Sequence, residues 1–144
     1  MSKPYLGLTV LMIFIVVVHV FLGGPQYAAA FAEQLSTPDL RAMSGVLWHA
    51  VTVALIGFAI SYMWLAFHHN PALCVAVSVL QIGWAGLFLY YGITQLGELG
   101  TQPQWVLFLG FPMAAYWAER QRRNMVGSGP SHIRAVANRQ GEAR

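Results

Sequence analysis

Residues 5–24 read YLGLTVLMIFIVVVHVFLGG, a stretch without a single Asp, Glu, Lys or Arg. The hydrocarbon core of a bilayer is about 30 Å thick, and an α-helix needs about 20 apolar residues to cross it. Further apolar runs occupy residues 44–67, 72–93 and 103–118. The sequence therefore predicts an all-α integral membrane protein, a bundle of four transmembrane helices.

The composition supports this class, because 57% of the 144 residues are hydrophobic and only 9% are charged. A soluble domain carries about 25% charged residues. The chain is long enough for one bundle at residues 1–119 and leaves no space for a separate soluble domain. Residues 120–144 are rich in arginine, glycine and polar side chains, and we expect a disordered basic tail there.

Breaker residues indicate where the helices end. Gly23, Gly24 and Pro25 are expected to end the first span, and Pro71 to separate the second span from the third in a tight hairpin. Between spans one and two, residues 31–43 are compatible with a short interfacial helix, and a turn or helix start is expected at Pro38. Pro112 predicts a kink in the fourth span. We expect the first span to be retained, because its apolar part is longer than the core of a signal peptide.

The distribution of basic residues predicts the orientation. Lys3 lies at the N-terminus and six arginines lie beyond residue 119, whereas the first and third loops contain only Arg41 against three acidic residues. Lys and Arg are in excess on the cytoplasmic side of membrane proteins. We therefore expect a multi-pass protein of the cell membrane with both termini in the cytoplasm.

Two histidines are the strongest functional signal. His19 lies about five residues before the outer end of the first span, and His49 about five residues after the outer start of the second, so both should lie roughly 7 Å deep. Ionisable side chains inside a membrane are costly and usually face protein or water. Gly23, one turn from His19, would admit a flat group.

Further polar side chains are expected at the same level, with Thr52, Tyr91 and Gln104 surrounding the two histidines. Neutral imidazole binds zinc, copper and iron, so His19 and His49 are candidate ligands of a metal or the two axial ligands of a b-type haem. The equally weighted alternative is that both rings only form interhelical hydrogen bonds. We interpret His68 and His69 as interfacial anchors.

The segments HVFLGGP at residues 19–25 and WHAVT at 48–52 resemble small four-span bacterial membrane proteins of uncharacterised function. That resemblance implies a fold and no activity. In length and number of spans the chain is also similar to the DoxX-like family of small membrane proteins linked to quinone and thiol redox chemistry. No sequence motif supports hydrolysis by a dedicated nucleophile, a phosphate-binding loop or a di-iron site.

Three functions remain open, and whether the protein is an enzyme is undecided. The first is a histidine-lined metal or haem site in the outer half of the bundle. The second is a small accessory subunit of a larger membrane complex or a homo-oligomer, packing through the small residues Ala50, Ala54, Gly57 and Ser61. The third is a small transporter or channel. The arginine-rich tail is compatible with anionic lipid, and nucleic acid is not an expected partner.

Overall fold

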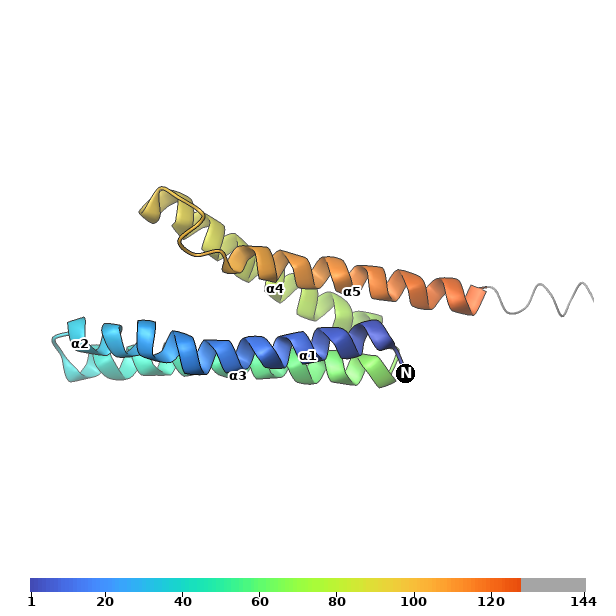
Figure 1. The fold of residues 1–144 in the computed structure, drawn as a ribbon, viewed down its shortest axis with the longest axis horizontal. Coiled ribbons are helices and arrows are strands. Elements are labelled where there is room, and N and C mark those ends of the chain that lie inside the picture. Colours follow the sequence, from blue (N-terminus) through green and yellow to red (C-terminus); the bar gives the residue numbers. More distant parts are fainter. Residues whose placement is uncertain (128–144) are drawn as a thin grey trace, which may run out of the picture.

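A computed structural model describes residues 1–127, and every regular element in that part of the chain is helical, as predicted. The elements are α1 (Lys3–Val18), η1 (His19–Ala29), α2 (Ala30–Gln34), α3 (Pro38–Phe67), α4 (Pro71–Tyr91), η2 (Gly92–Leu96) and α5 (Gln104–Gly127). Because α1, η1 and α2 are continuous, as are α4 and η2, the described residues form four long helical rods (Figure 1).

Three of these rods are long and apolar enough to cross a membrane, namely Lys3–Gln34, Pro38–Phe67 and Pro71–Leu96. Their length and composition are those of membrane spans. The fourth rod, α5, begins with the apolar run predicted as a span but continues for two turns through charged residues such as Arg120 and Arg123.

The first helix does not end at Gly24, contrary to the prediction. It continues through the π-helical segment η1, which contains Pro25, and through α2 to Gln34. Proline clashes with the preceding turn of a regular α-helix, and the wider π-helical turns give its ring more space. Residues 31–43 consequently form no separate interfacial helix.

The break between the first two rods falls at residues 35–37. Leu35 and Thr37 are extended, the Thr37 hydroxyl accepts a hydrogen bond from the Leu40 amide at 3.4 Å, and Pro38 opens α3. Proline is favoured at the first helical position because its missing N–H is not needed there. The helix start expected near Pro38 is therefore confirmed, six residues earlier than the start of the predicted span.

The tail prediction is wrong for residues 120–127, which continue α5. Arg, Gln and Glu are good helix formers, and contacts of Arg122 with the rest of the protein hold this segment in place. The remainder of the predicted tail, residues 128–144, lies outside the described part of the chain.

The rods pack as two antiparallel pairs, α1 to α2 along α3 and α4 along α5 (Figure 1). The α3–α4 turn is as tight as predicted, with the Asn70 side chain accepting from the Leu73 amide at 3.0 Å, but α3 and α4 then diverge. The pairs meet at the end that carries the N-terminus and this turn, which we call the closed end. They separate towards residues 35–37 and 97–103, which we call the open end.

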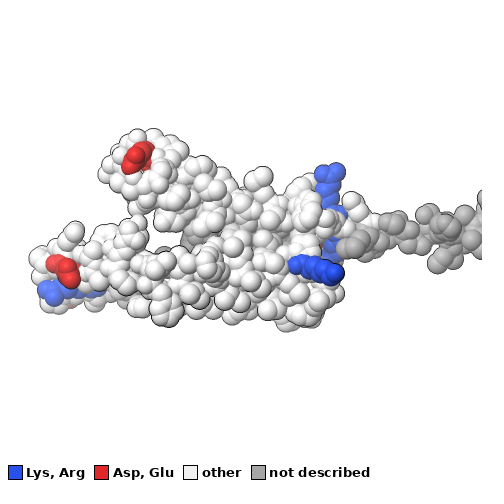
Figure 2. Space-filling view, in the orientation of Figure 1, with Lys and Arg blue, Asp and Glu red and all other residues white. Residues whose placement is uncertain are grey.

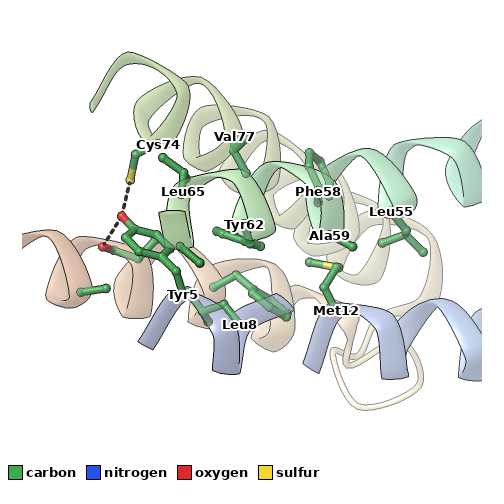
Figure 3. Packing of buried hydrophobic residues seen from close by; sticks show 14 of the residues in the cluster. Tyr5, Leu8, Met12, Leu55, Phe58, Ala59, Tyr62, Leu65, Cys74 and Val77 are labelled. Carbon is green, nitrogen blue, oxygen red and sulfur yellow. Dashed lines mark hydrogen bonds between the residues drawn. The ribbon is translucent and has the colours of Figure 1, made fainter. Parts of the chain in front are cut away.

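The buried core lies mainly at the closed end and in the middle of the rods (Figure 3). Tyr62 of α3 stacks on Tyr5 of α1 and on Phe111 of α5, with ring centroids 6.4 and 5.7 Å away. Further along, the Trp84 ring packs edge-on against Phe58 and Phe108. Aromatic rings from all four rods thus fill the space where the two pairs meet.

Candidate functional site at the open end

His19 is the first residue of η1, and its ring lies against an aromatic ring of α3. The imidazole stacks on the indole of Trp48, with centroids 4.2 Å apart and planes inclined by 13°. A Cβ atom on Gly23 would lie 3.0 Å from Cη2 of the same indole. The flat group that Gly23 admits is therefore Trp48 of this chain.

His49 follows Trp48 directly, and its side chain is exposed. Successive residues of an α-helix point about 100° apart, so only one of the two can face the first rod. Burying the indole of Trp48 removes more apolar surface than burying an imidazole, which favours the observed choice. The structure brings His19 together with Trp48, and His49 lies on the outside of the same helix pair.

The three residues expected to surround the histidines are distributed over both helix pairs. The Thr52 hydroxyl donates to the Trp48 carbonyl oxygen at 3.2 Å and so belongs to the His19 site. Tyr91 is exposed and contacts Tyr90 edge-on at 5.2 Å. Gln104 opens α5, and its Oε1 is buried without a hydrogen-bond partner. The expected polar layer is thus split where the pairs diverge.

The chemistry available at this site is limited. Nε2 of His19 is buried and makes no hydrogen bond. Leaving a buried polar atom unpaired costs about 1–3 kcal/mol, so this nitrogen can accept one ligand or hydrogen-bond donor favourably. Within residues 1–127, no three His, Cys, Asp or Glu side chains come together as a group that could hold a metal ion.

A second polar cluster, at the closed end, was not anticipated. The Arg122 guanidinium donates to the carbonyl oxygens of Leu65 at 2.8 Å and His68 at 3.3 Å, and lies 5.5 Å from the centroid of the Tyr5 ring. These contacts join α5 to the C-terminal end of α3 and to α1. The pairing of a helix C-terminus with a cation is favourable, because the last carbonyls of a helix lack partners.

Glu119 lies one turn before Arg122 and is 7% exposed. Its Oε1 is 3.3 Å from Nδ1 of His69 and 3.6 Å from Nε of Arg123. His68 instead stacks on Trp64, with centroids 4.0 Å apart. The sequence signal that could have revealed this cluster is the spacing of Glu119, Arg122 and Arg123, since residues three and four apart share a helix face.

Two buried tyrosine hydroxyls connect the pairs below this cluster, and Figure 3 shows the contacts of Tyr5. The Tyr5 hydroxyl lies 3.3 Å from Sγ of Cys74 and donates to the Ala115 carbonyl oxygen at 3.3 Å. The Tyr62 hydroxyl donates to Oε1 of Gln81 at 2.7 Å, while Nε2 of Gln81 has no partner. These contacts hold α4 and α5 against the N-terminal pair.

An apolar groove of about 370 Å³ runs between α1 and α3. Its lining consists of Thr9, Ile13, Val16, Val17, Ile56, Ala59, Ile60 and Met63. The Thr9 hydroxyl donates to the Tyr5 carbonyl oxygen at 2.9 Å, so it offers little to a polar ligand. The groove is therefore suited to hydrocarbon.

No protein-family model matches this chain, and neither the curated proteins nor the solved structures contain a significant match to it. The grounds for a function are therefore the helix lengths, the exposed surfaces and the two polar clusters.

Proposed function

We propose that this protein is a four-span membrane protein with cytoplasmic termini that acts as a small accessory subunit of a larger membrane assembly. The observations that carry the proposal are the length of the N-terminal helix pair, which exceeds the hydrocarbon core of a bilayer, and the exposed apolar side chains at its open end. The four-span bundle, the orientation and the partner are all parts of this proposal.

The charges support the orientation. Lys3, Arg120, Arg122 and Arg123 lie at the closed end, whereas Glu33, Asp39 and Glu98 lie at the open end with Arg41 (Figure 2). The excess of Lys and Arg on the cytoplasmic side of membranes makes the closed end cytoplasmic. The fourth span is then residues 104–118 of α5, bounded by Glu119. It is about 22 Å long, shorter than the hydrocarbon core, so the bilayer must thin locally around it.

The helix α3 is longer than the hydrocarbon core of a bilayer. Its 30 residues measure about 45 Å at 1.5 Å per residue. Fitting about 45 Å into a hydrocarbon core of about 30 Å requires a tilt of about 48°, beyond the usual range of about 0–40°. With the closed end at the inner boundary, the first two rods extend beyond the outer boundary.

The part beyond the hydrocarbon core carries large, exposed apolar side chains. Phe31 is 56% exposed, Leu40 51% and Met43 57%. Contiguous exposed apolar surface outside the membrane typically marks a protein interaction site. A neighbouring subunit would cover these side chains.

The same face continues down α3 within the membrane. Ala50 and Gly57 are exposed, and a Cβ atom on Gly57 would meet nothing within 4 Å. Small residues on a lipid-facing helix allow another helix to approach closely. Within the described residues, the Gly57 position is open, which leaves this face available to a partner helix, as the accessory-subunit hypothesis requires.

The test is the mass of the protein extracted from its native membrane in lipid nanoparticles, measured for the natural protein, Gly57→Leu and Gly86→Leu. Gly86 of α4 is an equally open helical glycine and serves as the matched control. We expect an assembly larger than the 15.9 kDa chain that Gly57→Leu disrupts and Gly86→Leu preserves. A monomer in native lipid would refute the proposal.

A second candidate is the metal or haem site, and the unpaired Nε2 of His19 specifically favours it. In this proposal His19 is one ligand of zinc, copper or a b-type haem, and His49 is the other after a rotation of α3. Absorption spectra before and after dithionite, together with elemental analysis, test it. A reducible Soret band or stoichiometric metal, lost in both His19→Ala and His49→Ala, is expected, and a colourless metal-free protein would refute it.

A further inference from the structure

The basic side chains of α5 at the closed end differ in their contacts. Arg122 is occupied by two carbonyl oxygens and the Tyr5 ring. Arg120 is exposed and makes no ion pair within residues 1–127, and Arg123 makes one long contact, 3.6 Å, with Glu119 while its side chain remains 71% exposed. Two guanidinium groups are therefore available to an external anion.

Exposed aromatic side chains lie one turn away on the apolar side of these groups. Tyr116 and Trp117 are 70% and 55% exposed and precede Arg120 by four and three residues, so all three share a helix face. Tyr and Trp settle at the level of lipid headgroups. Arg120 would then lie at the level of the phosphates.

The surrounding charge at this end is also positive. Lys3 is exposed, and hydrogen bonding of the Ser2 amide to the Ala66 carbonyl oxygen at 2.7 Å fixes the start of α1 beside the end of α3. Glu119, the acidic side chain of this end in the described part of the chain, is 7% exposed and already lies against His69 and Arg123. An approaching anion therefore meets mainly positive charge (Figure 2).

We propose that Arg120 and Arg123 form a binding site for the phosphate group of an anionic phospholipid at the closed end. Guanidinium groups bind phosphate oxygens in a bidentate manner, and each basic residue near an anionic surface adds about 1 kcal/mol, or about fivefold in affinity. Loss of both charges should weaken lipid binding by about 30-fold. The site rests on the four-span part of the proposed function, but it does not require a partner subunit.

The experiment is native mass spectrometry of the full chain in detergent, titrated with phosphatidylglycerol or phosphatidylcholine. We expect phosphatidylglycerol to bind preferentially, the Arg120→Gln/Arg123→Gln variant to lose that preference, and Arg41→Gln at the open end to retain it. Arg120→Gln alone removes no ion pair within residues 1–127, so it should weaken binding about fivefold without disturbing the fold.

Two results would overturn the proposal. One is equal affinity of the natural protein and the double variant for phosphatidylglycerol, and the other is an equal loss in Arg41→Gln, which would indicate a general effect of charge. A further titration with inorganic phosphate tests whether the site binds the phosphate group of a lipid or free phosphate. Displacement of the lipid by millimolar phosphate would assign the site to free phosphate instead, whereas retention supports the lipid.

Discussion

The imidazole of His19 lies flat on the indole of Trp48, with ring centroids 4.2 Å apart, and this contact joins the π-helical part of the first rod to α3. Aromatic pairs contribute about 0.5–1.5 kcal/mol beyond the area that they bury. The two histidines of the chain's most distinctive sequence pattern therefore have unequal roles in stability, because His49 is exposed.

His19→Ala should lower the free energy of unfolding by about 1 kcal/mol through loss of the ring contact. His49→Ala, the control on the neighbouring helix, should change it by no more than about 0.5 kcal/mol. Equilibrium unfolding in mixed micelles followed by tryptophan fluorescence measures both. Equal losses in the two variants would show that His49 is also packed.

Gly23→Ala places a methyl group 3.0 Å from Trp48 Cη2, so the indole or the backbone must shift. Overpacking of this kind costs about 1–3 kcal/mol. Gly24→Ala adds the same methyl group where nothing lies within 4 Å and should be neutral or slightly stabilising, since alanine is the better helix former. Thermal unfolding of both variants in one detergent decides the comparison, and a Gly23→Ala protein as stable as Gly24→Ala would contradict this packing.

Arg122→Gln should destabilise the closed end. The substitution removes charged hydrogen bonds to the Leu65 and His68 carbonyl oxygens, each worth about 1.5–3 kcal/mol. We expect a loss of at least about 2 kcal/mol in unfolding free energy. Arg120→Gln, two residues earlier and exposed, is the matched control and should remain within about 0.5 kcal/mol of the natural protein.

Because Tyr62 and Gln81 share a buried hydrogen bond, the effects of substituting them on the unfolding free energy should be strongly non-additive. Tyr62→Phe leaves the Gln81 side chain buried with no partner for Oε1, at a cost of about 1–3 kcal/mol. Adding Gln81→Leu removes the remaining polar group and should recover most of that loss, because replacing both partners with apolar groups is nearly neutral. A double-mutant cycle on unfolding free energies tests this, and simple additivity would show that the two side chains do not interact.

Cys74 provides a probe of the core, since it is the one cysteine of the chain and is 8% exposed beside the Tyr5 hydroxyl. In the folded protein it should react with maleimide at least about tenfold more slowly than in denaturant, as expected for a buried thiol. Tyr5→Ala opens space next to the sulfur and should accelerate the reaction. Rapid labelling of the natural protein would place Cys74 at an exposed surface.

Local physics explains which features could be predicted from the sequence. Apolar runs of the length of a membrane span, the proline-initiated start of α3 and the Asn70–Pro71 turn follow from the residues themselves, and the structure has all three. The break expected at Gly23–Pro25 is absent. A change to π-helical hydrogen bonding let the chain pass Pro25, and packing against α3 compensated for unfavourable local propensity.

The candidate site was only partly predictable. The distances of His19 and His49 from the ends of their spans predicted the same depth for both residues. Depth, however, does not determine which side of a helix faces its neighbour. The Arg122 contacts were also missed, because Leu65 and His68 are 57 and 54 positions away in the sequence and no periodicity connects them.

The sequence by itself determined that this chain is helical and apolar enough for a membrane, because these properties depend on composition and on runs of consecutive residues. Only the tertiary structure decided that Trp48 rather than His49 meets His19, that the rods pair as α1 with α3 and α4 with α5, and that Arg122 fastens the closed end. Those choices depend on how competing faces of the helices bury the most apolar surface and satisfy the most polar groups at once, and that comparison exists only when all the helices are assembled.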